Sequence, residues 1–286
     1  MYDLFAGNHP LSSIRITGAT SQFGRRICKL AACFLIFCAS CTVCVSQTND
    51  LVAAIDLAKQ SVVPVVCIVR NADTGEANIR FRILGTAFLI DPTGIFITAF
   101  HVIRDMMQDP WKIACTPGIT FPSGGWTRQK SDVNWFKFDR DHCQVNEAFD
   151  VAVCRTVNDI SKMKGLVYQI PTISNIRPPD GTSIFFTGFP LQATDPITAS
   201  GTIAGFTADS DYNTIMIDKN AWPGASGSPI FLSDGKTVVG IVLQTGTGDA
   251  IGLSYGTSGE KIAEVLTNAK KRFTQQDQQK AAPSPR

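Results

Sequence analysis

The segment WPGASGSP at positions 222–229 places a serine, Ser226, between two glycines, and an apolar run follows it. A tight turn of this kind can present a serine hydroxyl as a nucleophile. Gly224 can adopt backbone angles that other residues avoid, so the N–H groups of Gly224 and Ser226 can point at one spot and stabilise an oxyanion there. The pattern is also typical of an ordinary turn between two strands, and the segment alone does not separate the two interpretations.

Two further segments carry the groups that a nucleophilic serine needs. The β-rich run 94–100 ends at His101, and an imidazole can take a proton from a serine hydroxyl near neutral pH. The segment 149–154 places Asp150 at the mouth of an apolar strand, where a buried carboxylate is costly unless it is paired. Asp150 is therefore a candidate for the acid that fixes the imidazole tautomer. The plainer alternatives are a core histidine bonded to backbone and a turn aspartate that caps a loop.

In the order His101, Asp150, Ser226, the three residues match the triad of chymotrypsin-like proteases. The sequence resembles trypsin-like serine proteases from about residue 62 to about residue 266, and it is most similar to the bacterial HtrA-like branch. The motifs that carry the resemblance are GTAFLI (85–90), TAFHV (98–102), FDVAV (149–153) and GASGSP (224–229), with TGFP (187–190) and AIGLSY (250–255) as weaker landmarks.

This resemblance implies an all-β fold of two six-stranded antiparallel barrels with the active site between them. The first barrel would span about 62–165 and contribute His101 and Asp150, and the second would span about 166–256 and contribute Ser226. The implied activity is that of a serine endopeptidase acting on proteins or peptides, with the Gly224 and Ser226 amides as the oxyanion hole. No metal and no organic cofactor are needed for this chemistry.

By the same resemblance, the S1 pocket that receives the side chain before the scissile bond is walled by Asn220, Val242, Leu243, Gln244 and Thr245. Asn220 stands six residues before the serine, where trypsins have an acid. Thr245 replaces a glycine that is common in digestive members and narrows the entrance. We therefore expect a small apolar or neutral residue at P1 rather than Arg or Lys.

Two other function classes compete with the protease hypothesis. A non-catalytic binding module, a protease fold kept at the cell surface for protein capture, would share the motifs, and Phe100 stands where the family often has a small residue. An esterase is disfavoured because the nucleophile segment lacks the Gly-x-Ser-x-Gly elbow and the triad order differs. We expect no appended PDZ domain after the C-terminal helix, so trimer assembly is not carried over and the oligomeric state stays open.

Composition and the N-terminal segment bear on the location of the protein. The 286 residues are 44% hydrophobic and 17% charged, and the net charge of +2 gives no argument for nucleic acid. Residues 1–46 resemble a signal peptide or signal anchor, because the apolar core 30–45 follows Arg25 and Arg26 and is short for a membrane span. Cleavage after Ser46 or Ser40, lipidation at Cys41 and a membrane tether through 27–45 stay open. Each places the catalytic part outside the cytoplasm, in the periplasm, cell envelope or medium.

The remaining segments are assigned from periodicity and turn residues. A short helix or linker is expected over 47–61, the protease domain over 62–272, a C-terminal helix over 257–272 and a disordered tail over 273–286. Met106 to Lys130, rich in Pro, Gly and Trp, is predicted as a long connection. Expected strands cover 63–70, 78–84, 86–91, 95–99, 133–139, 150–155, 183–188, 197–206, 214–218, 228–232, 237–244 and 250–254.

Four of the nine cysteines lie in the body of the chain, and the other five belong to the N-terminal segment. In an exported protein, Cys115 and Cys143 are candidates to pair, because both lie in the irregular part between the histidine and aspartate motifs. Cys67 and Cys154 lie in apolar strand runs and are interpreted as buried thiols. A zinc site at His142 and Cys143 is disfavoured, because adjacent ligands lack the usual spacing.

Overall fold

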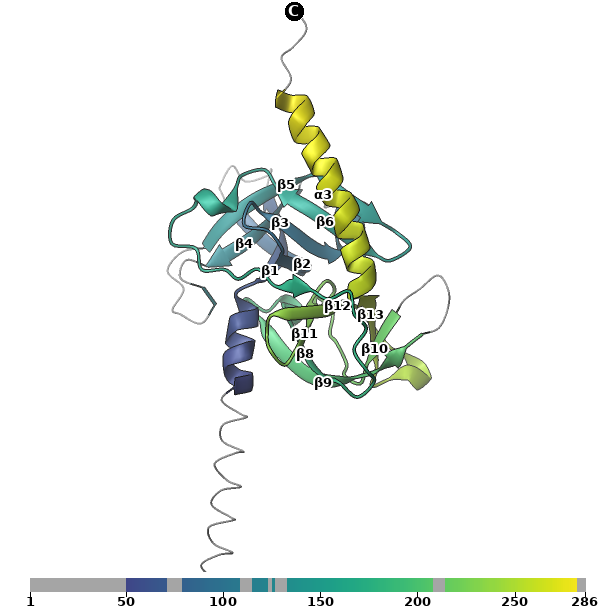
Figure 1. Ribbon diagram of the computed structural model, residues 1–286. Coiled ribbons are helices and arrows are strands. Elements are labelled where there is room, and N and C mark those ends of the chain that lie inside the picture. The colour runs from purple at the N-terminus through teal and green to yellow at the C-terminus, as the bar shows by residue number, and fades with distance from the viewer. Residues whose placement is uncertain are drawn as a thin grey trace, which may run out of the picture. The chain divides into compact units, whose positions relative to one another are not determined.

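The computed structural model describes residues 50–70, 79–108, 115–122, 125–126, 133–207 and 214–281 (Figure 1). The fold below belongs to the compact unit Asp50–Arg286. The predicted signal segment, residues 1–46, lies outside the described residues.

The first barrel is closed and runs in the strand order β1-β2-β3-β6-β5-β4. β-branched and aromatic residues dominate its strands, and alternate side chains fill the interior with Phe96, Ile119, Phe136 and Phe138. The nine-residue helix α2 (Phe100–Gln108) follows β3 directly. The strands are β1 (Val62–Arg70), β2 (Ile79–Leu89), β3 (Ile95–Ala99), β4 (Cys115–Pro122), β5 (Val133–Asn146) and β6 (Val151–Thr156).

The second barrel follows the order β11-β8-β9-β10-β13-β12 and closes through the pairing of β11 with β12. A two-residue strand, β7 (Thr172–Ile173), adds to β12 in parallel. The strands of the second barrel are β8 (Ser183–Gly188), β9 (Ile197–Phe206), β10 (Thr214–Ile217), β11 (Pro229–Leu232), β12 (Thr237–Thr245) and β13 (Ser254–Ser258), and its short helical turns are η3 (Pro190–Gln192) and η4 (Gly248–Ala250). The turn η2 (Ile160–Lys162) comes before this barrel, and Ile160 packs in the core of the first. The predicted fold of two six-stranded antiparallel barrels is confirmed.

One hydrophobic cluster joins the two barrels and the C-terminal helix α3 (Gly259–Ala281). Phe88 and Ile97 come from the first barrel, and Phe185 and Phe231 from the second. Ile262, Val265, Ala269 and Phe273 of α3 lie at helical spacing on the buried face. Figure 1 shows α3 running past β12 and β13 and on alongside β5 and β6, so this helix packs on both barrels.

Several predicted boundaries in the chain are wrong. β4 lies inside the predicted connection 106–130, because pairing with β1 and β5 closes the barrel and overrides a Pro- and Gly-rich composition. The two strands predicted over 78–91 are one strand, β2. The last strand, β13, begins at Ser254 rather than at residue 250, since residues 248–250 form η4.

The predicted tail 273–286 is helical as far as Ala281, where α3 ends. Phe273 is buried, and the Arg155 guanidinium carbon lies over the Phe273 ring, 5.0 Å from the ring centre. Arg155 also forms a two-bond ion pair with Asp277, at 2.7 and 3.0 Å. These contacts with β6 hold a polar segment in helical form that composition alone predicts to be disordered. A helix over residues 50–59 agrees with the predicted N-terminal helix.

The four body cysteines pair differently from the prediction. Disulfides join Cys67 to Cys115 and Cys143 to Cys154. The first links β1 to β4, and the second links residues directly opposite each other on β5 and β6. The prediction failed because Cys115 and Cys143 lie on strands rather than in an irregular region.

Candidate active site

His101 and Asp150 lie together because of strand register. β3 pairs with β6 so that Ala99 faces Val151, and the residues just beyond this pair are therefore neighbours. The Phe100 N–H donates to the Asp150 carbonyl at 3.0 Å, which fixes the start of α2 against the mouth of β6. The two predicted residues come together here, as the sequence hypothesis requires.

The Asp150 carboxylate holds His101 through both of its oxygens. Oδ1 accepts the backbone N–H of His101 at 2.7 Å, and Oδ2 lies 2.6 Å from the imidazole Nδ1. Because an ionised carboxylate only accepts hydrogen bonds, Nδ1 carries the proton and the lone pair remains on Nε2. The side chains keep 24% and 29% of their surface exposed, so the pair is reachable from solvent.

Asp150 has a φ of 50°, a left-handed conformation that is unfavourable for a residue other than glycine. Contacts on the preceding residue support it. The hydroxyl of Thr257 in β13 donates to the Phe149 carbonyl, and the Lys261 ammonium of α3 lies 4.8 Å from the Phe149 ring. The second barrel and α3 thus help to hold a strained residue of the first barrel.

Ser226 lies in two consecutive tight turns. The Ala225 N–H donates to the Trp222 carbonyl at 2.9 Å, and the Ser228 N–H donates to the Ala225 carbonyl at 2.9 Å. In each turn the third residue is a glycine with positive φ, 95° at Gly224 and 85° at Gly227. This is the type II geometry, and it explains why glycines flank the serine.

Two amides of this segment are free to serve an oxyanion. Within the described part of the chain, the N–H groups of Gly224 and Ser226 donate to no other group, whereas those of Ala225, Gly227 and Ser228 are all bonded. The two unbonded donors are the pair predicted as the oxyanion hole. Preorganised amides of this kind are the means by which acyl-transfer enzymes stabilise a tetrahedral intermediate.

The serine hydroxyl donates to the Leu243 carbonyl at 3.0 Å. Among the described residues no hydrogen bond joins Ser226 to His101. The two segments are nevertheless close: a Cβ built on Gly85 would lie 2.6 Å from the Val102 side chain and 3.1 Å from the Ser226 carbonyl. Only glycine at position 85 therefore lets the histidine helix and the serine turn approach each other in this way.

The predicted S1 residues have distinct roles. The Thr245 hydroxyl donates to the Ala221 carbonyl at 2.6 Å and accepts the Ala221 N–H at 3.0 Å, so it bridges two of the segments predicted to wall the pocket. Asn220 accepts the Gly252 N–H through its side chain at 3.0 Å. Val242 is buried and bonds Gly227 and Ser228 through its backbone, so it supports the serine turn. Leu243 and Gln244 line a cavity of about 230 Å³ together with Tyr255.

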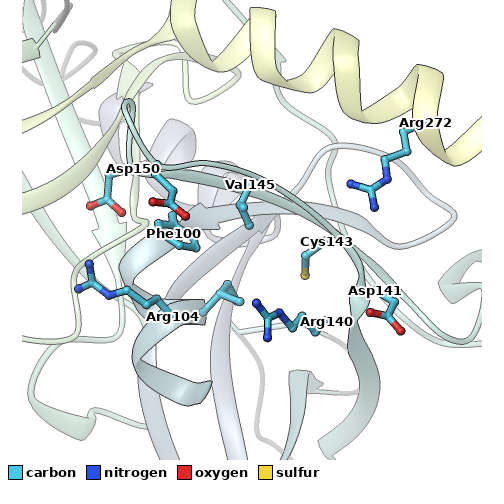
Figure 2. Close-up of a pocket in the computed structure, with 10 residues that line it drawn as sticks. Phe100, Arg104, Arg140, Asp141, Cys143, Val145, Asp150 and Arg272 are labelled. Atoms are coloured by element: carbon cyan, nitrogen blue, oxygen red, sulfur yellow. The ribbon is translucent and has the colours of Figure 1, made fainter. Parts of the chain in front are cut away.

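Two other cavities border the site. One of about 440 Å³ contains His101, Gly224, Leu191 and Gln192 in its lining. The other, of about 800 Å³, is shown in Figure 2, where Phe100 and Asp150 lie at one end and Asp141 and Arg272 at the other. Asp150 therefore borders a cavity on the side of α2 as well as contacting His101.

In the part of the chain that the structure describes, no group of three or more His, Cys, Asp or Glu residues is arranged to hold a metal ion. His142 lies 4.0 Å from Asp139, and Cys143, its neighbour, is in a disulfide.

Sequence reasoning missed residues that contact the serine turn from outside. Thr86 in β2 and the segment 189–192 bond to residues 222–226, across gaps of about 30 to 140 residues in sequence. The TGFP motif at 187–190 covers part of this region, but its residue types do not predict which groups it bonds to.

The described residues form two closed antiparallel barrels. One barrel carries a histidine–aspartate pair, and the other carries a serine turn with two unbonded amides. This arrangement is that of the chymotrypsin fold of serine proteases. The sequence profile of the trypsin-like peptidase domain matches residues 85–241, which is more than half of the chain. The chain belongs to this family and is a serine protease of the trypsin-like class.

The crystal structure of Deg5, an HtrA-family protease, superimposes with a TM-score of 0.56 and 17% sequence identity. The match covers 76% of this chain and 92% of that one, and it supports the chymotrypsin fold. No curated protein sequence matches the chain.

Proposed function

We propose that this protein is an exported serine endopeptidase that uses His101, Asp150 and Ser226 as its triad. The observation that carries the proposal is the His101 pair: Nδ1 is bonded to Asp150 at 2.6 Å, and Nε2 is left to act as a base. The free amides of Gly224 and Ser226 supply the second requirement, a site for the oxyanion.

In this mechanism Ser226 first exchanges its bond to the Leu243 carbonyl for one to His101 Nε2. His101 takes the hydroxyl proton while the Ser226 oxygen attacks the scissile carbonyl, whose oxygen becomes negative and is held by the two amides. The imidazolium then gives its proton to the leaving amine, and an acyl-enzyme remains. His101 then takes a proton from a water molecule that attacks the ester carbonyl. It returns this proton to the Ser226 oxygen as the bond to the acyl group breaks, which releases the acid and restores the free serine.

The proposed P1 residue is small and apolar or neutral. The Thr245 bridge to Ala221 supports it, because a side chain bonded across the pocket wall leaves less room than a glycine would. The side chain of Asn220 is neutral and already bonded to the Gly252 N–H, so it offers no charge to Arg or Lys. A P1-varied peptide panel tests this, and a strong preference for Arg would overturn it.

Export is proposed from the N-terminal sequence and the disulfides. Residues 27–45 supply the signal or membrane tether in the sequence hypothesis, and the Cys67–Cys115 and Cys143–Cys154 bridges suit an oxidising compartment. Among the described residues, no helix combines the length and apolar character that a membrane span requires. Fractionation of cells that express the full chain, with protease accessibility from outside, tests the location.

The experiment for catalysis is covalent labelling of the full chain by a fluorophosphonate probe, beside Ser226→Ala and His101→Ala. Labelling of the wild-type protein that both substitutions abolish is the expected result. A folded wild-type protein that does not label would contradict the proposal. The bond from Ser226 to Leu243 would then describe a latent serine, and a binding module at the cell surface would be the better hypothesis.

A further inference from the structure

The serine turn is oriented by residues outside itself, above all by Thr86 of β2. The Thr86 N–H donates to the Ser226 carbonyl at 2.8 Å, and its hydroxyl donates to the Gly224 carbonyl at 2.9 Å. The same hydroxyl accepts the Phe189 N–H at 2.9 Å. Thr86 is fully buried, so water does not replace these bonds if they are removed. One first-barrel residue thus joins the serine turn to the segment that precedes η3.

The segment around η3 fixes the peptide between Pro223 and Gly224. The Leu191 N–H donates to the Pro223 carbonyl at 2.7 Å. In a trans peptide the C=O and N–H point in opposite directions, so this bond turns the Gly224 N–H away from Leu191. That N–H is one of the two unbonded donors described above.

The internal bond of the turn does not decide this orientation. Type I and type II turns share the same bond from the fourth N–H to the first carbonyl, here Ala225 to Trp222, and they differ by a flip of the central peptide. Glycine at position 224 can adopt either conformation. A flip would aim the Pro223 carbonyl, instead of the Gly224 N–H, at the oxyanion. The Leu191 bond opposes the flip because it would be broken.

Leu191 is held in place by its neighbour, Gln192. The Gln192 side chain accepts the Ile83 N–H at 3.0 Å and donates to the Ile83 carbonyl at 2.6 Å. β2 pairs with β3 only over residues 87–89, so Ile83 lies on a strand edge, and the amide takes the place of a strand partner.

The conformation of this segment needs such support. Leu191 and Gln192 have φ values of 54° and 63°, in the left-handed region that residues other than glycine rarely adopt. Leu191 is 65% exposed, so burial of its own apolar surface holds it weakly. The Gln192 amide supplies bonds that offset the strain.

We propose that Thr86 and Gln192 are positioning residues that preset the oxyanion hole across the barrel interface. Thr86 holds the carbonyls of Gly224 and Ser226. Gln192 anchors η3 on β2, so that the Leu191 N–H keeps the Pro223–Gly224 peptide turned. The inference rests on the proposed protease function, and it adds two residues that do not touch the reacting atoms.

The first test compares Thr86→Val with Thr86→Ser in the full chain. Valine keeps the shape and removes the hydroxyl, while serine keeps the hydroxyl. Loss of one oxyanion donor lowers kcat by roughly 100- to 1,000-fold in acyl-transfer enzymes. For a misoriented donor we expect Thr86→Val to lower kcat at least about tenfold with little change in KM, and Thr86→Ser to stay near the wild type. The substrate is the peptide of the P1 panel that the wild-type protein cleaves best.

A peptide boronic acid separates positioning from general damage. Its boron bonds to Ser226 and one of its oxygens occupies the oxyanion hole, so its inhibition constant should rise by the same factor as kcat falls. The matched control is Thr156→Val at the far end of β6, where another buried threonine hydroxyl donates to a backbone carbonyl, that of Asn158, at 2.7 Å. Thr156→Val should lower the thermal midpoint and leave kcat unchanged.

The second test uses Gln192→Ala and Gln192→Glu. Alanine removes both bonds to Ile83 and should lower kcat with the same rise in the boronate constant. An ionised glutamate at 192 can accept the Ile83 N–H, but its other oxygen cannot donate to the Ile83 carbonyl. A protonated glutamate can donate to that carbonyl, as the glutamine does. The ratio of kcat for Gln192→Glu to kcat for the wild type should therefore rise as pH falls, which a purely steric role would not produce. Gln278→Ala, at an exposed glutamine of α3, is the control and should leave kcat unchanged.

The outcomes separate this inference from the protease function. A wild-type protein that neither labels nor cleaves would contradict the function itself. A wild-type protein that labels and cleaves, with Thr86→Val and Gln192→Ala within about twofold of it in kcat, would overturn only the positioning role. Loss of activity in Thr156→Val equal to that in Thr86→Val would also overturn it, because destabilisation alone would then explain both.

Discussion

The two halves of the active site are held in different ways. His101 and Asp150 belong to one barrel and contact each other directly, through an imidazole and a carboxylate that meet at 2.6 Å. Ser226 belongs to the other barrel, and its hydroxyl bonds to Leu243 rather than to His101. Its turn receives bonds across the interface, from Thr86 to the carbonyls of Gly224 and Ser226.

This difference follows from what each half must hold. The acid–base pair is set by the register of β3 against β6, a short antiparallel pairing that also fixes the backbones around it. The nucleophile needs two amides aimed at empty space, and unbonded donors cannot hold themselves in place. The carbonyls of the same peptides are held instead: that of Pro223 by the Leu191 N–H of η3, and that of Ala225 by the Ser228 N–H within the turn. Thr86 of the first barrel holds the neighbouring carbonyls of Gly224 and Ser226.

The largest expected effect breaks the acid–base half. Asp150→Asn should leave the fold intact and lower kcat by about 10,000-fold, because an amide that donates to Nδ1 would favour the wrong imidazole tautomer. Steady-state kinetics with the preferred peptide, beside circular dichroism of the variant, measures it. Near-normal turnover would mean that another residue supplies the acid.

A second prediction concerns a substitution that weakens the hydrophobic cluster joining the two barrels. Phe273 of α3 is buried in the cluster that joins both barrels, so Phe273→Ala should lower the free energy of unfolding by roughly 3 kcal/mol. Urea unfolding followed by fluorescence measures it. Asp277→Ala is the comparison, because it removes the partly exposed ion pair with Arg155 and should cost about 1 kcal/mol or less. Equal losses for the two variants would contradict a core role for Phe273.

A third prediction concerns the nucleophile half, at its substrate pocket. Thr245→Gly removes the bridge to Ala221 and widens the predicted S1 entrance. The ratio of kcat/KM for a P1 phenylalanine peptide to that for a P1 alanine peptide should rise about tenfold, which is the scale of discrimination by pocket size. An unchanged ratio would place S1 elsewhere. Thr245→Val, which keeps the bulk, should retain the preference for small residues.

The smallest expected effect lies in the second barrel, away from the serine turn. The bond from the Thr202 N–H lowers the pKa of Asp218 below its usual value of 3.8, and this outweighs the opposing effect of burial. Because the pKa is lower in the folded state, the ionised carboxylate stabilises the fold above the unfolded-state pKa, and this contribution is lost as pH falls through the folded-state pKa. Asp218→Asn should therefore be less stable than the wild type at pH 7, with the difference shrinking by pH 3. Urea unfolding at both pH values measures it, and a constant difference would contradict the assignment.

Sequence patterns predicted much of this site because its candidate catalytic residues lie in short local motifs. A histidine at the end of one β-run, an aspartate at the start of another and a serine between glycines are each visible within ten residues, and their order indicates the fold. The wrong predictions concern segments whose state depends on distant partners. β4 is a strand because β1 and β5 lie beside it, and residues 273–281 are helical where Phe273 and Asp277 meet Arg155.

The sequence by itself determined which residues carry the candidate chemistry, the two-barrel class and the use of a glycine at 224. These depend on residue type and on contacts within a few positions, where backbone sterics dominate. Only the tertiary structure decided the disulfide partners, the bridge from Thr245 to Ala221 and the bonds from Thr86 and Gln192 that orient the serine turn. Hydrogen bonds between groups 20 to 140 residues apart depend on how the strands close into barrels, and residue spacing along the chain does not encode that closure.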